Sequence, residues 1–341
     1  MFVTYQNGGV ILKSTNASAT AFGWEFQSNA AIMLMLKNIE RATKVKVEGE
    51  TEDVEITFSD GKMLMSQAKS VVKADDLNNV RSNLKKGLGT LNNASKLNNV
   101  EQLVFITNSP NPFNDTSTEY HFSSPLNIVP FSALHRNAKK VIDDICSKNG
   151  YDFDKEMLSI CVMQFHTDDL DERYKVLFDL TTQFLNSLGR HRIATNELLT
   201  LWQHSFAVNA TQRSTSITKK RMMWPIIAIL CDVSVEDGEL QDYDENDVEE
   251  IIHKYKSVIN NNSERFEFIS RVLSDYNEYE TGMKSRERTE KFIAEKWNNY
   301  ENDFDLKSAD DATREMVIRL TVANVLRSKT VISQIKSKVK L

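Results

Sequence analysis

Apolar and polar positions alternate between residues 43 and 70, which predicts three short strands in succession. The first strand covers residues 43–50, and the second and third cover residues 53–58 and 63–70. Valine, isoleucine, threonine and phenylalanine favour pleated structure, and the Asp60-Gly61 pair between the last two strands is a strong turn signal. We therefore expect an antiparallel hairpin near the middle of a sheet.

Helical patterns flank these strands on both sides. Residues 22–42 are rich in alanine, methionine and leucine, with charges toward the end, which predicts a largely buried helix. Residues 75–97 open with two aspartates that can cap a helix and continue with leucines at helical spacing, and a compact apolar strand follows at 103–108. A strand, a crossover helix and a second strand form the unit from which α/β sheets are built.

The pattern of apolar and polar residues changes after residue 165. Before it, prolines predict a long irregular excursion at 109–130, which is followed by a helix at 131–148 and a strand at 157–165. Beyond it, the long segments show only the 3.6-residue period of amphipathic helices. We therefore expect an α/β domain over residues 1–165, with a mixed sheet flanked by helices, and a mostly α-helical domain over residues 166–341.

Composition and charge describe an ordinary globular protein. The chain has 341 residues, of which 40% are hydrophobic and 26% are charged, and its formal net charge is −6. A negative total does not exclude nucleic acid, because local patches decide binding and the first hundred residues carry a small excess of basic side chains. The few, widely spaced cysteines form neither a disulfide framework nor a metal knuckle. No signal-peptide pattern opens the chain and no apolar run approaches the ~20 residues of a membrane span, so we expect a cytoplasmic protein without membrane contact.

The third predicted strand carries unexpected polar residues. Gln67 and Lys69 project from the same face of that strand, and Asp53 opens the neighbouring strand. A charge in the middle of a sheet is costly unless it is paired or bound to a metal. A carboxylate followed on the next strand by Gln-x-Lys suits phosphodiester hydrolysis: Asp53 would bind Mg²⁺, or Mn²⁺ in its place, and Lys69 would orient the attacking water. Gln67 would add its amide oxygen or hold a metal-bound water, and Ala68 would add its backbone carbonyl oxygen.

This site has a geometric condition. Asp53 shares a face with Gln67 only when the two residues pair directly or differ by an even offset. They pair directly when paired positions on the two strands add up to 120, which requires a loop with an odd number of residues. A two-residue turn would place Asp53 beside Ala68, on the wrong face. We therefore predict a three-residue loop over residues 59–61 with Gly61 in the left-handed region, or an equivalent bulge.

Other residues are candidates for a supporting role. Glu48 ends the preceding strand and could face the same cleft, and Glu25 and Gln27 lie near the start of the first predicted helix. A plainer interpretation also stays open, in which Lys69 is a strand-end lysine that reaches solvent and Asp53 merely begins a strand.

Patterns typical of other enzymes are missing from the sequence. The 6 histidines show no metal-ligand spacing, and neither a glycine-rich phosphate loop nor a G-x-S-x-G elbow appears. An ATPase and a serine hydrolase therefore lack support. The acidic stretch at 236–250 is best interpreted as a solvated loop beside a helix.

Three segments, AFGWEFQ, VEGETEDVEI and MSQAKS, followed by a helix and by LVFITN, together resemble the PD-(D/E)xK restriction-endonuclease-like fold. More narrowly, they resemble the double-stranded DNA nuclease domain of bacterial anti-phage effectors, such as those of cyclic-oligonucleotide (CBASS) and Lamassu-type systems. The resemblance covers about residues 20–110 and continues loosely to residue 165, and SITKKRMMWPII at 216–227 is similar to a segment that follows such domains. The Gln-x-Lys form departs from the fold's usual Glu-x-Lys.

This resemblance implies Mg²⁺-dependent cleavage of double-stranded DNA by Asp53, Gln67 and Lys69, supported by Glu48 and Gln27. It also implies an effector that is held off until a ligand or partner assembles it, with a homo-oligomer as the active form. Regulatory partners such as an SMC-like ATPase complex would act through the helical half, as a sensor or docking module. A non-catalytic adaptor, which uses a degenerate nuclease fold to bind DNA or other subunits, stays open as the alternative.

Overall fold

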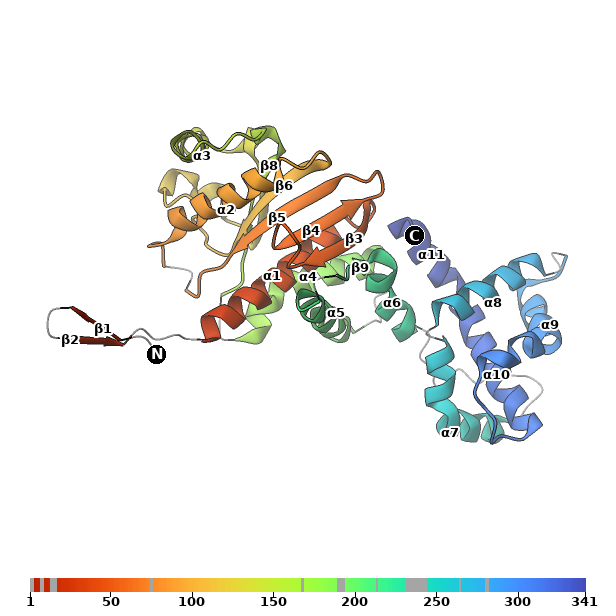
Figure 1. Ribbon diagram of the computed structural model, residues 1–341. Coiled ribbons are helices and arrows are strands. Elements are labelled where there is room, and N and C mark those ends of the chain that lie inside the picture. Colours follow the sequence, from red (N-terminus) through yellow and green to blue (C-terminus); the bar gives the residue numbers. More distant parts are fainter. Residues whose placement is uncertain are drawn as a thin grey trace. The chain divides into compact units, whose positions relative to one another are not determined.

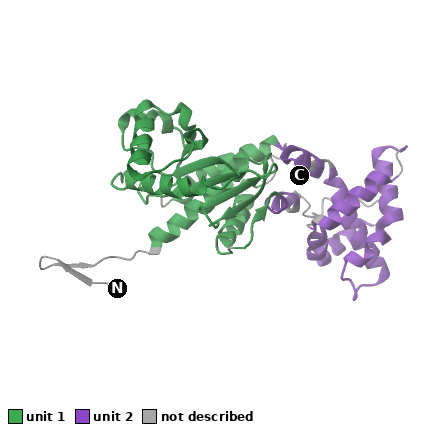
Figure 2. Cartoon of the chain, turned by 45° about the horizontal axis from the view of Figure 1, so that its top comes forward, with its two compact units in different colours: residues 1–187, 194–219 green, residues 188–193, 220–341 purple. Residues whose placement is uncertain are grey.

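The chain forms two compact units in the computed structural model (Figure 1). The first unit combines residues 1–187 with 194–219, and the second combines 188–193 with 220–341 (Figure 2). The residues that the structure describes are 3–6, 9–12, 17–73, 76–166, 169–188, 194–212, 214–230, 244–263, 265–279 and 282–341.

A mixed sheet forms the centre of the first unit. Its 7 strands lie in the order β7-β8-β6-β5-β4-β3-β9, in which the pairs β5/β6 and β6/β8 are parallel and the other neighbours are antiparallel. The strands are β3 (Ala42–Val47), β4 (Val54–Phe58), β5 (Met63–Lys69), β6 (Val100–Thr107), β7 (Leu126–Pro130), β8 (Leu158–Met163) and β9 (Ile217–Thr218). The predicted α/β class with a mixed sheet is confirmed.

The register between β4 and β5 is the one that the candidate site requires. Partner numbers add up to 120 along the whole pairing, for example at Val54 opposite Ser66. The Phe58 N–H donates to the Lys62 carbonyl oxygen at 2.8 Å and so closes a three-residue loop. Gly61 in that loop has a φ of 81°, a left-handed conformation that glycine adopts without strain. The predicted loop and its register are therefore confirmed.

Helices cover both faces of this sheet (Figure 1). Helix α1 packs on β3, β4 and β5 and against α4 and α5. On the opposite face, leucines of α2 and apolar residues of α3 share one core with Met65 of β5 and with β6 and β8. The helices of this unit are α1 (Ala17–Lys37), α2 (Val80–Ala94), α3 (Arg136–Asn149), α4 (Leu170–Ser187) and α5 (Thr195–Ala210). Because Met65 faces α2, the alternation of β5 also turns Gln67 and Lys69 toward that side.

Three parts of this unit differ from the prediction. The segment at 109–130 is more regular than expected, since it contains the 3-10 helix η1 (Thr116–Phe122) and the edge strand β7. An edge strand tolerates Pro130, because one side of the strand has no hydrogen-bonding neighbour. A short hairpin of β1 (Val3–Gln6) and β2 (Gly9–Leu12) and the two-residue strand β9 were not predicted either. The expected helix cap at Asp75 lies outside the described residues.

The predicted boundary at residue 165 is wrong for the compact units. The first unit extends to Lys219, because α4 and α5 pack on α1 and because β9 pairs with β3. Periodicity marked the change from strands to helices correctly, but these helices complete the layer over the sheet. An amphipathic face alone does not reveal which surface covers it.

The second unit is helical, as predicted for the end of the chain. Beyond α6 (Lys219–Leu230), its elements are α7 (Glu245–Ser263), α8 (Phe266–Glu278), α9 (Ser285–Lys296), η5 (Trp297–Asp303), α10 (Asp311–Arg327) and α11 (Lys329–Val339). Most of the acidic stretch at 236–250 lies outside the described residues. None of the described helices combines the length and hydropathy of a membrane-spanning segment.

Candidate functional site

Polar side chains gather where β3 turns into β4 and where β5 ends. We call this group the acidic corner, and its members are Glu48, Glu52, Asp53, Gln67 and Lys69. Strand β5 supplies Gln67 and Lys69 on one side, and the β3–β4 turn supplies the three acids on the other. The electrostatic effects of Asp53 and Lys69 on Glu48 and Glu52 show that the group is compact.

Asp53 is held by the end of β5. Its Oδ2 accepts a hydrogen bond from the Ala68 backbone N–H at 2.9 Å and a second from Nε2 of Gln67. The Gln67 Oε1 in turn accepts from the Thr90 hydroxyl of α2 at 2.6 Å. Helix α2 comes close enough because it has Gly87 there: a Cβ at this position would lie 2.5 Å from the Phe105 ring. The sequence prediction that Asp53 and Gln67 meet is therefore confirmed.

The contacts differ in detail from the ligand set that the sequence predicts. Gln67 was expected to offer its amide oxygen to a metal or to hold a metal-bound water, but here the amide nitrogen donates to Asp53 and the oxygen accepts from Thr90. Ala68 was expected to contribute its carbonyl oxygen, whereas its N–H makes the contact with Asp53. In this arrangement Gln67 and Ala68 orient the carboxylate.

Glu52 is a member of the site that the sequence prediction missed. This residue is only 4% exposed, and neither carboxylate oxygen forms a hydrogen bond of ordinary geometry with the described residues, although the Thr90 hydroxyl lies near enough to lower the pKa of Glu52. Burial, with the negative charge of Asp53 next, raises the pKa of Glu52 to about 8. The density of acids in the turn EGETED was a signal that could have revealed this residue.

The other two acids of the corner are also less acidic than usual. Burial raises the pKa of Asp53, although the Lys69 charge, the Ala68 N–H and the Gln27 and Gln67 side chains lower it. Burial and then the Asp53 charge raise the pKa of Glu48, and Gln27 opposes this rise as a hydrogen-bond partner. Asp53 thus repels both Glu48 and Glu52 in a poorly solvated place, which favours binding of a proton or a cation.

The β3–β4 turn is built to present these acids. Glu48 has a φ of 50°, in the left-handed region, and its N–H donates to the Asp53 carbonyl oxygen at 2.8 Å. Glu55 stabilises the turn, because its Oε1 accepts hydrogen bonds from the backbone N–H groups of Thr51 at 2.8 Å and Glu52 at 3.3 Å. A strained non-glycine residue in such a turn is often part of a functional site.

The supporting residues divide into two groups. Glu48 and Gln27 lie at the acidic corner, as predicted. Glu25 does not join them: it forms an ion pair with Arg173 at 3.1 Å and accepts a hydrogen bond from the Tyr174 hydroxyl. Glu25 therefore fastens α1 to α4, and its predicted role beside a metal is wrong for this structure.

Lys46 anchors α5 beside the corner. Although it is only 8% exposed, its Nζ donates to the Asn209 carbonyl oxygen at 3.1 Å and to that of Gln212. The Val47 N–H donates to Asn209 Oδ1 at 2.9 Å. The last carbonyl groups of a helix have no partner within the helix, so a lysine can cap them. Strand alternation alone would have left Lys46 in solvent.

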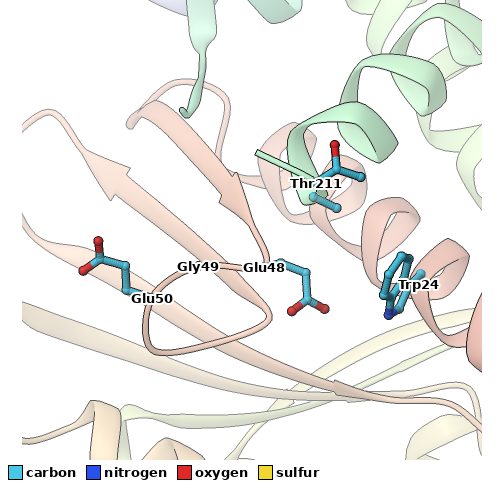
Figure 3. Close-up of a pocket in the computed structure, with 6 residues that line it drawn as sticks. Trp24, Glu48, Gly49, Glu50 and Thr211 are labelled. Atoms are coloured by element: carbon cyan, nitrogen blue, oxygen red, sulfur yellow. The ribbon is translucent and has the colours of Figure 1, made fainter. Parts of the chain in front are cut away.

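A pocket of about 810 Å³ opens between this helix end, α1 and the β3–β4 turn (Figure 3). The residues that line it are Trp24, Glu48, Gly49, Glu50, Ala210 and Thr211. The Glu48 carboxylate lies between the turn and the Trp24 indole, whereas the Glu50 side chain points away from Trp24. Because Glu48 also interacts with Asp53 and Lys69, the pocket borders on the acidic corner.

The acidic corner offers oxygen atoms that suit a hard cation. The unpartnered oxygens of Glu52 and the unpartnered Oε1 of Gln27 are buried polar groups of the kind that a divalent ion would satisfy. Within the described part of the chain, however, no three side chains of histidine, cysteine, aspartate or glutamate converge closely enough to hold a metal ion. The donor chemistry fits Mg²⁺, and binding would have to draw the carboxylates together.

Comparisons with known proteins leave the chain without an assigned family. No family model and no curated protein matches it. The Cap4 SAVED/CARF-domain containing receptor of Acinetobacter baumannii, solved with the cyclic trinucleotide 3'3'3'-cAAA, matches at a TM-score of 0.38 and 12% identity, over 61% of this chain and 45% of the receptor. The corresponding receptor of Moraxella osloensis matches at a TM-score of 0.37 and 16% identity, over 61% and 47%. The chain spans about half the length of these structures, and so distant a likeness adds nothing to what its own residues indicate about fold or activity.

Proposed function

We propose that this chain is a Mg²⁺-dependent endonuclease that cleaves double-stranded DNA. The observation that carries the proposal is the register of β4 and β5, which places Asp53 opposite Gln67 with Lys69 on the same face. Beside them, Glu52 is buried with unpartnered oxygens, and a structural role does not explain that cost. The restriction-endonuclease-like fold, which the sequence resembles, remains part of the proposal.

Each residue of the corner has a distinct role in this reaction. Asp53 and Glu52 would hold the cation, which can be Mg²⁺ or Mn²⁺, Gln67 would keep Asp53 in place, and Glu48 would support the site from the side of the pocket. The bound cation would supply Lewis acidity toward the scissile phosphate. Lys69 would donate hydrogen bonds to the attacking water and stabilise the negative charge that grows on the phosphate oxygens.

We further propose that the enzyme is an effector of bacterial anti-phage defence. This setting follows from the resemblance of the strand and helix segments to nuclease effectors of that kind. The second unit would then receive the activating signal, through a regulatory protein such as an SMC-like ATPase complex or through a cyclic nucleotide. The active form would be a homo-oligomer, which brings two corners to the two strands of a duplex.

Plasmid cleavage tests the proposed reaction. The protein and its partners are incubated with supercoiled DNA in Mg²⁺, Mn²⁺, Ca²⁺ or EDTA, and nicked and linear products are measured on gels. Cleavage should require Mg²⁺ or Mn²⁺ and be lost in Lys69→Ala. The matched control is Lys62→Ala, which removes an exposed lysine from the same hairpin. If Lys69→Ala still cleaves the plasmid, Lys69 does not have the proposed catalytic role.

The second candidate function is a non-catalytic adaptor that binds DNA or other subunits. The contacts of Gln67 favour it, because both ends of the amide are occupied within the protein. The same experiment separates the two functions. DNA binding without cleavage in any metal and with any partner would identify the adaptor.

A further inference from the structure

The pocket beside the acidic corner has an aromatic wall that the proposed reaction does not use. Trp24 belongs to α1 and is 57% exposed, whereas Phe22 and Phe26 of the same helix are buried. The indole lines the pocket together with Glu48 and Thr211. A single exposed aromatic is common on protein surfaces, but one that lines a pocket next to a candidate active site has a flat face available for a ligand.

The electrostatics of the pocket decide which part of a nucleic acid can enter. Glu48 is a carboxylate, and Thr211 lies at the carboxyl end of α5, where the helix dipole is negative. Both disfavour a phosphate group. The lysine that suits a phosphate is Lys69, at the acidic corner. An uncharged base is therefore the part of a nucleotide that can occupy the pocket when its neighbouring phosphate lies at the corner.

The chemistry of Glu48 narrows the choice of base. Its carboxylate lies between the β3–β4 turn and Trp24, so a base that stacks on the indole has its edge near Glu48 (Figure 3). A carboxylate accepts hydrogen bonds from exocyclic amino groups, which cytosine, adenine and guanine carry and thymine lacks. Every base can stack on an aromatic side chain, so Trp24 would increase the affinity for any base. Glu48 would favour the bases that carry an amino group.

We infer that Trp24 and Glu48 bind an unpaired, amino-bearing base next to the phosphate that is cleaved. This inference rests on the proposed function, and it names the substrate as a duplex with a base out of the stack, such as a bulge or a junction with a single strand. A fully paired duplex keeps its bases inside the helix, where an indole on the protein surface does not reach their faces.

Binding measurements in the Lys69→Ala background test this inference without interference from cleavage. Fluorescence anisotropy gives the affinity for four labelled duplexes: fully paired, with a bulged cytosine, with a bulged thymine, and with an abasic bulge. The bulged cytosine should bind most tightly. Trp24→Ala should weaken its binding about fivefold to a hundredfold, and Trp24→Phe, which keeps an aromatic face, should restore part of the loss.

Two further variants make the result specific. Tyr120→Ala removes a side chain of similar exposure, 61%, that does not line the pocket, and should leave binding unchanged. Glu48→Gln should reduce the preference for cytosine over thymine, because an amide can both donate and accept. Quenching of Trp24 emission by the bulged duplex, absent in Trp24→Phe, reports contact directly, and circular dichroism shows whether each variant is folded.

Several results would overturn the inference. Equal affinity for the bulged and abasic duplexes would do so, as would equal loss in Trp24→Ala and Tyr120→Ala. If a lysine-rich peptide quenches Trp24 and the bulged duplexes do not, the pocket binds cations. Failure here is distinct from failure of the proposed function: cleavage with no effect of Trp24→Ala contradicts only this inference, and base binding without cleavage contradicts only the nuclease.

Discussion

Glu52 at the acidic corner and two carboxylates of the second unit, Asp275 and Asp303, have opposite surroundings. In the second unit, Asp303 accepts a hydrogen bond from Arg271 on α8, and Asp275 of α8 accepts one from the Tyr300 hydroxyl at 2.8 Å. At the corner, the Glu52 oxygens form no hydrogen bond of ordinary geometry with the described residues. The first pattern fixes η5 on α8. The second destabilises the fold unless something binds, which is typical of a functional site.

This difference between the two regions indicates where chemistry is expected in the chain. Arg271 also stacks on Tyr300, with its guanidinium carbon 5.3 Å from the ring centre, so Arg271, Asp303 and Tyr300 hold one another in place. A carboxylate with hydrogen-bond partners has a structural role, because it holds neighbouring elements together. A buried carboxylate that lacks a partner and repels its neighbours calls for an external cation or proton.

The largest expected effect is on the rate of DNA cleavage, which should depend on a carboxylate of the acidic corner and not on one of the second unit. Asp53→Asn should lower the rate of DNA cleavage by about a thousandfold, since an amide is a poor ligand for a hard cation. Asp303→Asn should leave the cleavage rate per folded molecule unchanged. Initial rates of plasmid nicking at equal concentrations of folded protein measure both. Equal losses in the two variants would end the distinction between a functional and a structural carboxylate.

The next effect is on stability and depends on pH. The pKa of Glu52 is near 8 in the folded protein and near 4.5 in the unfolded chain, so the folded state retains a proton between these values. The free energy of unfolding should therefore fall as pH rises from 4.5 to 8. Glu52→Gln removes the buried charge and should stabilise the protein by about 2 kcal/mol at pH 9, with a flatter profile.

Urea denaturation at a series of pH values measures this difference. The control is Glu50→Gln, which changes an exposed glutamate of the same turn and should keep the profile of the unmodified protein. If the free energy of unfolding depends on pH in the same way in Glu52→Gln and Glu50→Gln, the charge of Glu52 does not destabilise the folded protein.

The smallest effect concerns the second unit alone. Tyr300→Phe removes the hydrogen bond to Asp275 and should destabilise the protein by about 1 kcal/mol, because the ring and its packing remain. Thermal unfolding followed by circular dichroism measures the shift, and the cleavage rate of the folded variant should not change. A loss of activity without loss of stability would show that this region also takes part in the reaction.

The parts of the site that the sequence predicted correctly depend on local rules. Alternation along β4 and β5, the turn signal at Asp60 and the requirement for an odd loop were enough to place Asp53 opposite Gln67. These features involve residues close together in the chain, so a pattern of a few positions contains them. The same holds for the helix and strand that follow.

The missed parts depend on contacts between distant segments. Lys46 is buried because the end of α5, more than 160 positions away, covers the edge of β3. Glu52 is buried in the turn beside Thr90 of α2. The end of the first unit at Lys219 follows from the packing of α4 and α5 on α1. Amphipathic patterns show that a surface is covered, and they do not name the partner.

The three-residue loop that ends in Gly61 limits which insertions and deletions this hairpin can accept during evolution. Deleting or inserting a single residue there shifts the pairing by one step and turns Asp53 away from Lys69, whereas a change of two preserves the face. Homologues that keep the proposed activity should thus differ in hairpin length only by even numbers, unless a bulge compensates. Parity of this length is a simple criterion for separating active descendants from inactive ones.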